Sequence, residues 1–240
     1  MIQSLLTKIC KRYLCKVHNL NKCSNELFTR IVTRDYDKVF CIGFGKTGTT
    51  SLEKLLIDMG FSIGSQDAGE MLINDYHEKK YENIINYFYS AEAFQDIPSS
   101  LPEIYKLAYK EFPNSKFIHT ERSSSEEWYN SLIRFHSLIY TNNKDIPTER
   151  DLLSSNYRYR GWSLKTKEVI FNYPKVPLYD KKHYISIYDN HNFNIKKFFK
   201  NKHNYLNINL SNNNSLELIC NFLGYKRNIN YNMPHLNKTF

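Results

Sequence analysis

Long apolar runs are absent from this sequence, and cysteine is sparse. No stretch approaches the roughly 18 consecutive apolar residues that a membrane-spanning helix needs. The chain has 5 cysteines in 240 residues, an odd number at irregular spacing. With no recognisable secretory signal beside them, they indicate reduced thiols rather than a disulfide framework, so we expect a cytoplasmic protein.

A standard metal-ligand pattern is also missing. Cys10, Cys15, His18 and Cys23 are near neighbours in the sequence and could suggest zinc. Their spacing matches none of the usual zinc motifs. We therefore expect no metal and interpret these cysteines as free thiols on a helix.

Acidic residues are missing from residues 1–23, which hold five basic ones. Apolar residues recur there near helical spacing and predict a basic amphipathic helix. We expect residues 1–35 to form an N-terminal helical segment that packs on the domain or frays. Peripheral contact with a membrane surface through residues 1–23 is the alternative.

The composition otherwise fits a folded domain. A hydrophobic content of 41% and an aromatic content of 15% exclude global disorder. A chain of 240 residues suits one sizeable domain with a full core. The net charge of +9 favours phosphorylated ligands, polyanions and membrane surfaces alike, so charge alone selects no partner.

Buried-strand patterns alternate with amphipathic helical patterns along the chain. Strands are expected at 38–42, 92–95, 116–120 and 204–209. Helices are expected at 50–59, 68–90, 101–111, 125–140, within 150–171, at 181–200 and at 214–223. This alternation is typical of a parallel sheet with helices on both faces, so we predict one α/β domain over residues 36–240.

A glycine-rich loop joins the first strand to its helix in the segment KVFCIGFGKTGTTSL. Gly45 and Gly48 let the backbone curl, so that the amides of residues 46–51 can point at an anion at the helix N-terminus. A nucleoside-triphosphate loop carries a lysine after its second glycine, where this chain has Thr49. The lysine here, Lys46, lies inside the turn, and no convincing strand-end aspartate is available for Mg²⁺. The loop therefore favours a compact phosphate group with a cation near its leaving oxygen.

The segment KFIHTERSSSEEWYNSL, residues 116–132, combines a strand, an arginine, a serine-rich turn and a helix. The Arg122 guanidinium can donate two hydrogen bonds to a phosphate, and a hydroxyl one or two helical turns later can complete the contact. The serines at 123–125 have a second interpretation as the N-cap of the helix, with Glu126 and Glu127 near its positive end.

Asp96 follows a short apolar strand and precedes Ile97-Pro98. A carboxylate held rigidly in this position can accept a proton from a reacting hydroxyl. The alternative is a structural carboxylate that caps a turn or the helix expected at 101–111.

Together these segments resemble the sulfotransferases that use 3′-phosphoadenosine 5′-phosphosulfate (PAPS). GKTGTTSL is similar to their 5′-phosphosulfate loop, and D-x-P is similar to a branch in which aspartate replaces a catalytic histidine. The ending MPHLNKTF is similar to the Pro-His-x-Asn of the same branch. The resemblance covers about residues 38–240 and implies a P-loop-like domain with PAPS as co-substrate and no metal.

The resemblance also implies roles for individual residues. Lys46 would stabilise charge on the bridging oxygen, and Asp96 would be the general base. The implied PAPS-binding residues are Gly45, Lys46, Thr47, Gly48, Thr49, Thr50, Ser51, Arg122 and Ser131. The Arg-Lys-Gly segment that binds the 3′-phosphate in cytosolic members is missing, so Lys238 or a basic residue of 158–167 would replace it.

The acceptor is less well defined by the sequence. The stretch YRYRGWSLKTK, residues 157–167, interleaves aromatic and basic side chains, which suits the cap over a small-molecule or carbohydrate acceptor. A solvated basic helix with core aromatics is the alternative. His191, His235, Asn237 and Lys238 are further candidates for contact with nucleotide or acceptor.

Two other functions compete with sulfonyl transfer. A nucleotide kinase would need the missing loop lysine and Mg²⁺. A basic nucleic-acid-binding protein would explain the net charge of +9 but not the order of loop, Asp96 and Arg122. We therefore expect no nucleic-acid partner, and an acceptor that presents a hydroxyl or an amine.

Overall fold

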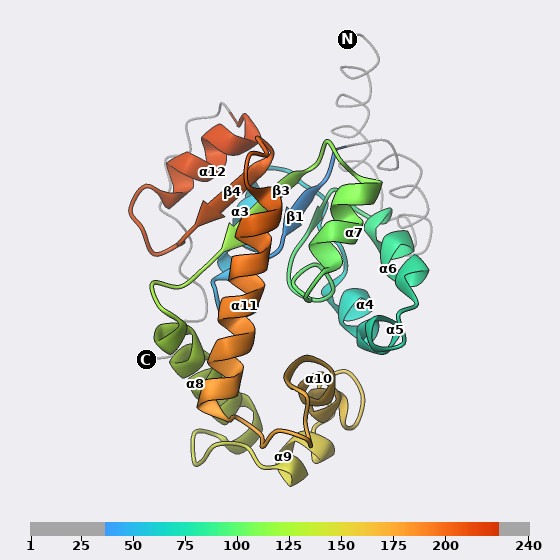
Figure 1. Ribbon diagram of the computed structural model, residues 1–240, viewed down its shortest axis with the longest axis vertical. Coiled ribbons are helices and arrows are strands. Elements are labelled where there is room, and N and C mark those ends of the chain that lie inside the picture. The colour runs from blue at the N-terminus through green and yellow to red at the C-terminus, as the bar shows by residue number, and fades with distance from the viewer. Residues whose placement is uncertain (1–36, 226–240) are drawn as a thin grey trace.

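The structure is a computed structural model that describes residues 37–225 (Figure 1). Its sheet contains the strands β1 (Val39–Cys41), β2 (Ala93–Phe94), β3 (Lys116–Thr120) and β4 (Tyr205–Ile208). All neighbouring pairs are parallel, and the order across the sheet is β2-β1-β3-β4. The predicted α/β class is confirmed. The segment 1–35 and the candidates His235, Asn237 and Lys238 lie outside the described residues.

The helices of the described part are α3 (Thr49–Asp58), α4 (Gln66–Met71), α5 (Ile73–His77), α6 (Tyr81–Phe88), α7 (Ile104–Glu111), α8 (Ser125–Thr141), α9 (Glu149–Ser154), α10 (Trp162–Phe171), α11 (Lys181–Phe199) and α12 (Ser215–Leu223). The prediction of one helix at 68–90 was wrong, because this segment is divided into α4, α5 and α6. The helix predicted within 150–171 is confirmed as α10, and α9 precedes it. None of the helices in the described part is long and apolar enough to cross a membrane.

Helices cover both faces of the sheet because the strand side chains alternate in direction. Val39 and Cys41 pack against Leu52 and Leu55 of α3 and Ile219 of α12. On the opposite face, β1 and its neighbours bury Phe40, Phe94 and Phe117 against α5, α6, α7 and the end of α11. The predicted coverage of both faces is confirmed.

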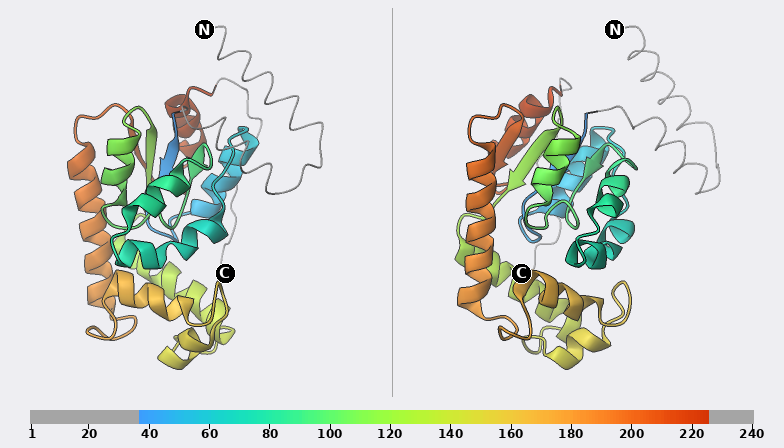
Figure 2. Two further views of the ribbon diagram at one scale, coloured as in Figure 1. Left: turned by 90° about the vertical axis from the view of Figure 1, so that its right-hand side faces the viewer. Right: turned by 45° about the vertical axis from the view of Figure 1, so that its right-hand side comes forward.

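A second group of helices lies beyond the carboxyl ends of the strands. We call α8, α9 and α10 the helical cap (Figures 1 and 2). Its own core contains Trp128, Leu152, Leu164 and Tyr184. Figure 2 shows α11 running along the molecule from the sheet to this cap, and α11 contributes side chains to the cores of both. The cap is therefore held at a fixed position over the strand ends.

Candidate active site

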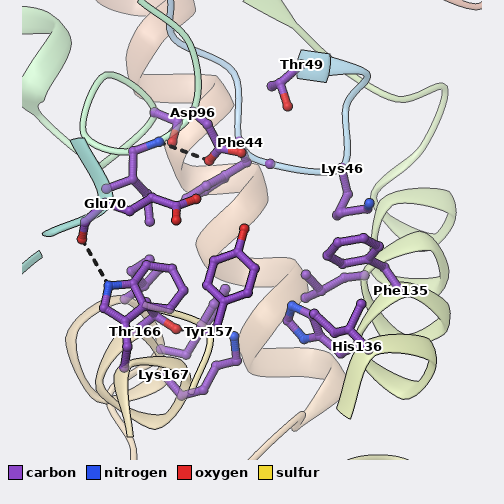
Figure 3. Close-up of a pocket in the computed structure, with 18 of the residues that line it drawn as sticks. Phe44, Lys46, Thr49, Glu70, Asp96, Phe135, His136, Tyr157, Thr166 and Lys167 are labelled. Atoms are coloured by element: carbon purple, nitrogen blue, oxygen red, sulfur yellow. Dashed lines mark hydrogen bonds between the residues drawn. The ribbon is translucent and has the colours of Figure 1, made fainter. Parts of the chain in front are cut away.

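A cavity of about 340 Å³ lies between the β1–α3 loop and the helical cap (Figure 3). The loop side contributes Phe44, Gly45, Lys46, Thr49 and Thr50, and the segment after β2 contributes Asp96. The cap contributes Trp128, Leu132, Phe135, His136, Ile139, Tyr140, Tyr157, Trp162, Thr166, Lys167, Ile170 and Phe171. The two residues predicted to carry catalysis, Lys46 and Asp96, thus open into one space.

Close packing fixes the shape of the β1–α3 loop. A Cβ atom at Gly43 would lie 2.2 Å from the Thr120 carbonyl oxygen of β3, so only glycine fits. The Thr47 hydroxyl lies 2.6 Å from both the Phe44 carbonyl oxygen and the Thr120 hydroxyl. The hydroxyl of Thr47 is therefore used inside the fold, and Thr47 does not line the cavity.

The N-terminus of α3 is suited to an anion. Gly48 occupies the N-cap position with φ 97°, and no side chain caps the helix there. The first turn contains no acidic residue. An uncapped helix N-terminus with a positive dipole end fits the compact phosphate group that the loop sequence favours. Thr49 and Thr50, at the start of this helix, both line the cavity.

Lys46 holds an unusual backbone conformation at the centre of the loop, with φ 71°. Its Nζ atom lies 3.3 Å from the centroid of the Phe135 ring in α8. Burial lowers the pKa of Lys46 to about 8, against the opposing attraction of Asp96, and the positive charge of Arg122 lowers it further. The attraction of Asp96 therefore does not fully offset the cost of burying the charged ammonium group.

Asp96 also has a positive φ, 56°. The Ser99 hydroxyl lies 2.9 Å from the Cys41 carbonyl oxygen and 2.8 Å from that of Asp96, which ties this turn to the end of β1. A Cβ atom at Gly45 would lie 3.6 and 3.7 Å from the two Asp96 carboxylate oxygens. The carboxylate thus lies directly against the loop.

The surroundings of Asp96 favour its neutral form. Burial raises the pKa of Asp96, while the Ile97 amide (3.0 Å from Oδ1), Lys46 and Ser100 act in the opposite direction. The alternative that Asp96 caps the helix expected at 101–111 was wrong, because α7 begins at Ile104 with Glu103 at its N-cap. The hydrogen bond from the Ile97 amide is consistent with the other alternative, in which the Asp96 carboxylate caps its own turn.

Arg122 follows β3 and contacts the loop from outside the cavity. Its Nε donates to the Lys46 carbonyl oxygen (2.8 Å), and its Nη1 donates to Glu127 Oε1 (3.1 Å). Ser131 is buried on α8. Neither Arg122 nor Ser131 lines the cavity, so these two predicted 3′-phosphate ligands are separated from the predicted catalytic pair.

The serine-rich turn after Arg122 acts as a helix cap. Ser124 is the N-cap of α8 and accepts the Glu127 amide at 3.1 Å. Glu127 Oε2 in turn accepts the Ser123 amide at 3.2 Å. This capping interpretation of the serines was one of the alternatives left open by the sequence.

His191, one of the further candidates for contact with nucleotide or acceptor, is a core residue. Its Nε2 lies 3.0 Å from the Ile42 carbonyl oxygen, and its ring packs 4.2 Å from the centroid of Phe44. Burial lowers the pKa of His191 to about 3. A neutral imidazole that donates to a backbone carbonyl and does not line the cavity supports the loop rather than the reaction.

The basic aromatic stretch divides between cavity and framework. Tyr157, Trp162 and Lys167 line the cavity. Arg158 pairs with Glu70 and Asp67, and Lys165 pairs with Glu168. The stretch is therefore neither wholly a solvated helix nor wholly an acceptor cap.

Sequence reasoning missed several side chains that α8 and α4 supply. Phe135, His136 and Glu70 all line the cavity. One signal was present: Trp128, Leu132, His136 and Tyr140 repeat every four residues, which places them on one face of a helix. What that face meets depends on tertiary packing and has no local signature.

Among residues 37–225, no group of three or more histidine, cysteine, aspartate or glutamate side chains is placed to hold a metal ion. The positive charges that face the cavity come from Lys46 and Lys167. An anionic substrate at this site would therefore meet lysine side chains and backbone amides.

A glycine-rich loop that leads from a parallel strand into an uncapped helix defines the phosphate-binding class of α/β proteins. Within that class, residues 38–239 match the family described as the sulfotransferase domain, and the chain belongs to that family. A comparison with curated proteins gives no match. Membership supports transfer of a sulfonyl group in general, to a small-molecule or carbohydrate acceptor in general.

Proposed function

We propose that this protein transfers a sulfonyl group from PAPS to a hydroxyl or amine of a small-molecule or carbohydrate acceptor. One observation carries the proposal. The Asp96 carboxylate lies against Gly45 of the anion-binding loop, and it opens into the same cavity as Lys46. A base and a cation thus flank the place where the helix N-terminus would hold the phosphosulfate.

The roles follow from the charge that moves during transfer. The acceptor oxygen attacks sulfur and forms the new S–O bond, and the S–O bond to the 5′-phosphate breaks. Asp96 accepts the proton of the acceptor hydroxyl. The bonding electrons remain on the 5′-phosphate oxygen, where Lys46 and the amides at the start of α3 stabilise the negative charge.

The 3′-phosphate would bind on the other side of the loop. Arg122 is fixed there by the Lys46 carbonyl oxygen and by Glu127, with its side chain 27% exposed. A phosphate can add to the remaining N–H groups of the guanidinium, since five donors are available. The 5′-phosphosulfate would be bound by Gly48, Thr49, Thr50 and Ser51.

A nucleotide screen by thermal shift tests this function. 3′-Phosphoadenosine 5′-phosphate (PAP), ATP and GTP are each added with and without Mg²⁺. PAP should raise the melting temperature in both conditions, because it binds only the folded state, and ATP and GTP should do so weakly. Stabilisation by Mg-ATP but not by PAP would support a kinase and refute the proposal.

The Arg122→Ala variant tests the 3′-phosphate contact in the same screen. Loss of a charge-assisted pair should weaken PAP binding by on the order of 2–3 kcal/mol. The preference for PAP over adenosine 5′-phosphosulfate, which lacks the 3′-phosphate, should fall at the same time. An unchanged preference would assign the 3′-phosphate to other residues.

A further inference from the structure

The end of the cavity away from the loop contains a buried lysine. Lys167 of α10 is 5% exposed. The polar contact of its Nζ atom is the Thr166 hydroxyl at 3.4 Å, and no carboxylate of residues 37–225 forms an ion pair with it. Burial lowers the pKa of Lys167 to about 7, since no neighbouring charge compensates the ammonium group.

His136 of α8 faces the same end of the cavity. It is 7% exposed, and its Nδ1 atom has no hydrogen-bond partner among the described residues. Its pKa is lowered by burial and then by the charges of Lys167 and Lys46. Figure 3 shows the amine of Lys167 and the ring of His136 at one end of the cavity, with Asp96 and Thr49 at the other.

Such a pair is costly in the absence of a ligand. A buried charge or polar group without a partner loses the hydrogen bonds that water supplies in the unfolded chain. A methionine at position 167 would fill similar space at no such cost. A buried lysine with one long contact to a hydroxyl and a buried imidazole nitrogen without a partner face the same cavity. A ligand that completes both explains them more simply.

We propose that Lys167 and His136 bind an anionic group of the acceptor, a carboxylate, sulfate ester or phosphate ester, while the acceptor hydroxyl lies at Asp96. The inference rests on the proposed function and names the acceptor class for the same site. Trp128, Phe135 and Tyr140 also line this cavity and suit an aromatic ring. The acceptor is thus an aryl alcohol or phenol that carries a negative charge remote from its hydroxyl.

Matched acceptors test the inference. 4-(Hydroxymethyl)benzoate and its biphenyl homologue provide two lengths, each assayed beside its uncharged methyl ester. The corresponding aryl sulfate and aryl phosphate distinguish the kinds of anion. At one length or the other, kcat/KM for an anion should exceed that for the ester on the order of ten- to a hundred-fold, as expected for a charge-assisted contact. Equal or better turnover of the ester at both lengths would overturn the inference.

Variants assign the preference to residues. Lys167→Met should abolish the preference for the anion, and His136→Leu should reduce it. Lys165→Met is the matched control, because Lys165 lies on the same helix but pairs with Glu168 and does not line the cavity. A preference that survives Lys167→Met would overturn the inference. Lys167→Met should also melt no lower than wild type, because it removes an unpaired charge; a fall would show that Lys167 has a structural partner.

A binding measurement separates this inference from the proposed function. Calorimetry measures the binding of 4-(hydroxymethyl)benzoate and its biphenyl homologue to wild type and to Lys167→Met, with and without PAP. If PAP fails to bind and no acceptor is sulfonated, the proposed function fails. Binding of either acid to wild type but not to Lys167→Met would still support the anion site. No binding, or equal binding to both proteins, would refute it.

Discussion

Lys46 and Asp96 both hold backbone conformations that side chains of L residues rarely adopt, with φ of 71° and 56°. Such strain persists only where neighbouring contacts over-determine it, and it is concentrated at functional sites. The Arg122 guanidinium holds the carbonyl of Lys46, and the Ser99 hydroxyl holds that of Asp96. Both side chains are therefore directed by contacts made through their own backbone.

Lys46→Met should separate catalysis from binding. Lys46 would stabilise charge that develops only as the bond to sulfur breaks, so kcat should fall on the order of 10²–10³-fold, while the Kd for PAP changes far less. Lys54→Met, which alters an exposed lysine of α3 paired with Asp58, is the control. Equal losses in kcat and in PAP affinity would reduce Lys46 to an ordinary phosphate ligand.

The pH profile gives a second check on Lys46. The pKa of about 8 belongs to the protein without substrate, so kcat/KM for PAPS should decline above about pH 8 as Lys46 loses its proton. Bound PAPS is an anion and raises this pKa, so kcat should hold to higher pH than kcat/KM. Coincident alkaline limbs in the two profiles would exclude Lys46 as their source.

Asp96→Asn tests the general base. The amide keeps the size of the side chain but cannot accept a proton at neutral pH, so turnover should fall about 10²–10⁴-fold with little change in PAP affinity or melting temperature. Because burial raises the pKa of Asp96, wild-type activity should rise with pH through a value above the usual aspartate range. Near-normal turnover with a lower melting temperature would show that Asp96 only stabilises its turn.

At the scale of elements, strand positions were the easiest to predict. β3 has the predicted bounds, because its buried run is short and flanked by turn residues. The division of 68–90 was missed: α5 ends before Lys79, which has φ 58°, and neither glycine nor proline marks the position. Within 150–171, Gly161 has φ 85° at the N-cap of α10 and marks where the predicted helix begins.

The site shows the same division between local and tertiary information. The loop, Asp96 and Arg122 could be predicted because each stands in a local pattern of strand, turn and helix. The hydrogen bond between the Thr47 and Thr120 hydroxyls could not be predicted, because Thr120 belongs to a neighbouring strand. His136 of α8 and Lys167 of α10 line one cavity only because of tertiary packing, which no local pattern encodes.

An ion pair connects α4 to the segment that precedes α10. Arg158 Nε contacts the carboxylate of Glu70, which is 4% exposed, and Trp162 Nε1 donates to the Glu70 carbonyl oxygen at 2.9 Å. Glu70 thus joins the sheet side of the cavity to the cap. Burial raises the pKa of Glu70, and the hydrogen bonds from Gln66 and Arg158 oppose that rise.

Arg158→Met should destabilise the protein because it leaves the buried Glu70 carboxylate without its charged partner, with a hydrogen bond from Gln66 remaining. Loss of one member of a buried pair costs about 3–5 kcal/mol, measured as the free energy of unfolding in urea. Addition of Glu70→Gln should recover a large part of the loss. Glu78→Gln, in an exposed pair with Lys80, is the control and should leave the melting temperature nearly unchanged. A double variant no more stable than Arg158→Met would mean that the pair itself is not the stabilising contact.

At the scale of the whole molecule, ionisable side chains from the sheet side and from the cap face each other across the cavity. The sheet side supplies Lys46 and Asp96, and the cap supplies His136 and Lys167. Both lysines have lowered pKa values, so holding either one charged in the protein without ligand costs free energy. An anionic donor and an anionic acceptor would each offset part of this cost.

The two lysines predict how stability depends on pH. The pKa values of about 8 for Lys46 and about 7 for Lys167 lie below the 10.5 of an unperturbed lysine. Between about pH 7 and pH 9 the unfolded chain therefore binds more protons than the folded protein, so the free energy of unfolding should rise with pH across this window. Urea unfolding at several pH values measures it directly. The double variant Lys46→Met, Lys167→Met should be more stable than wild type near pH 7, with the advantage shrinking toward pH 9. Parallel curves for the two proteins would show that neither lysine is charged at a cost in the folded state.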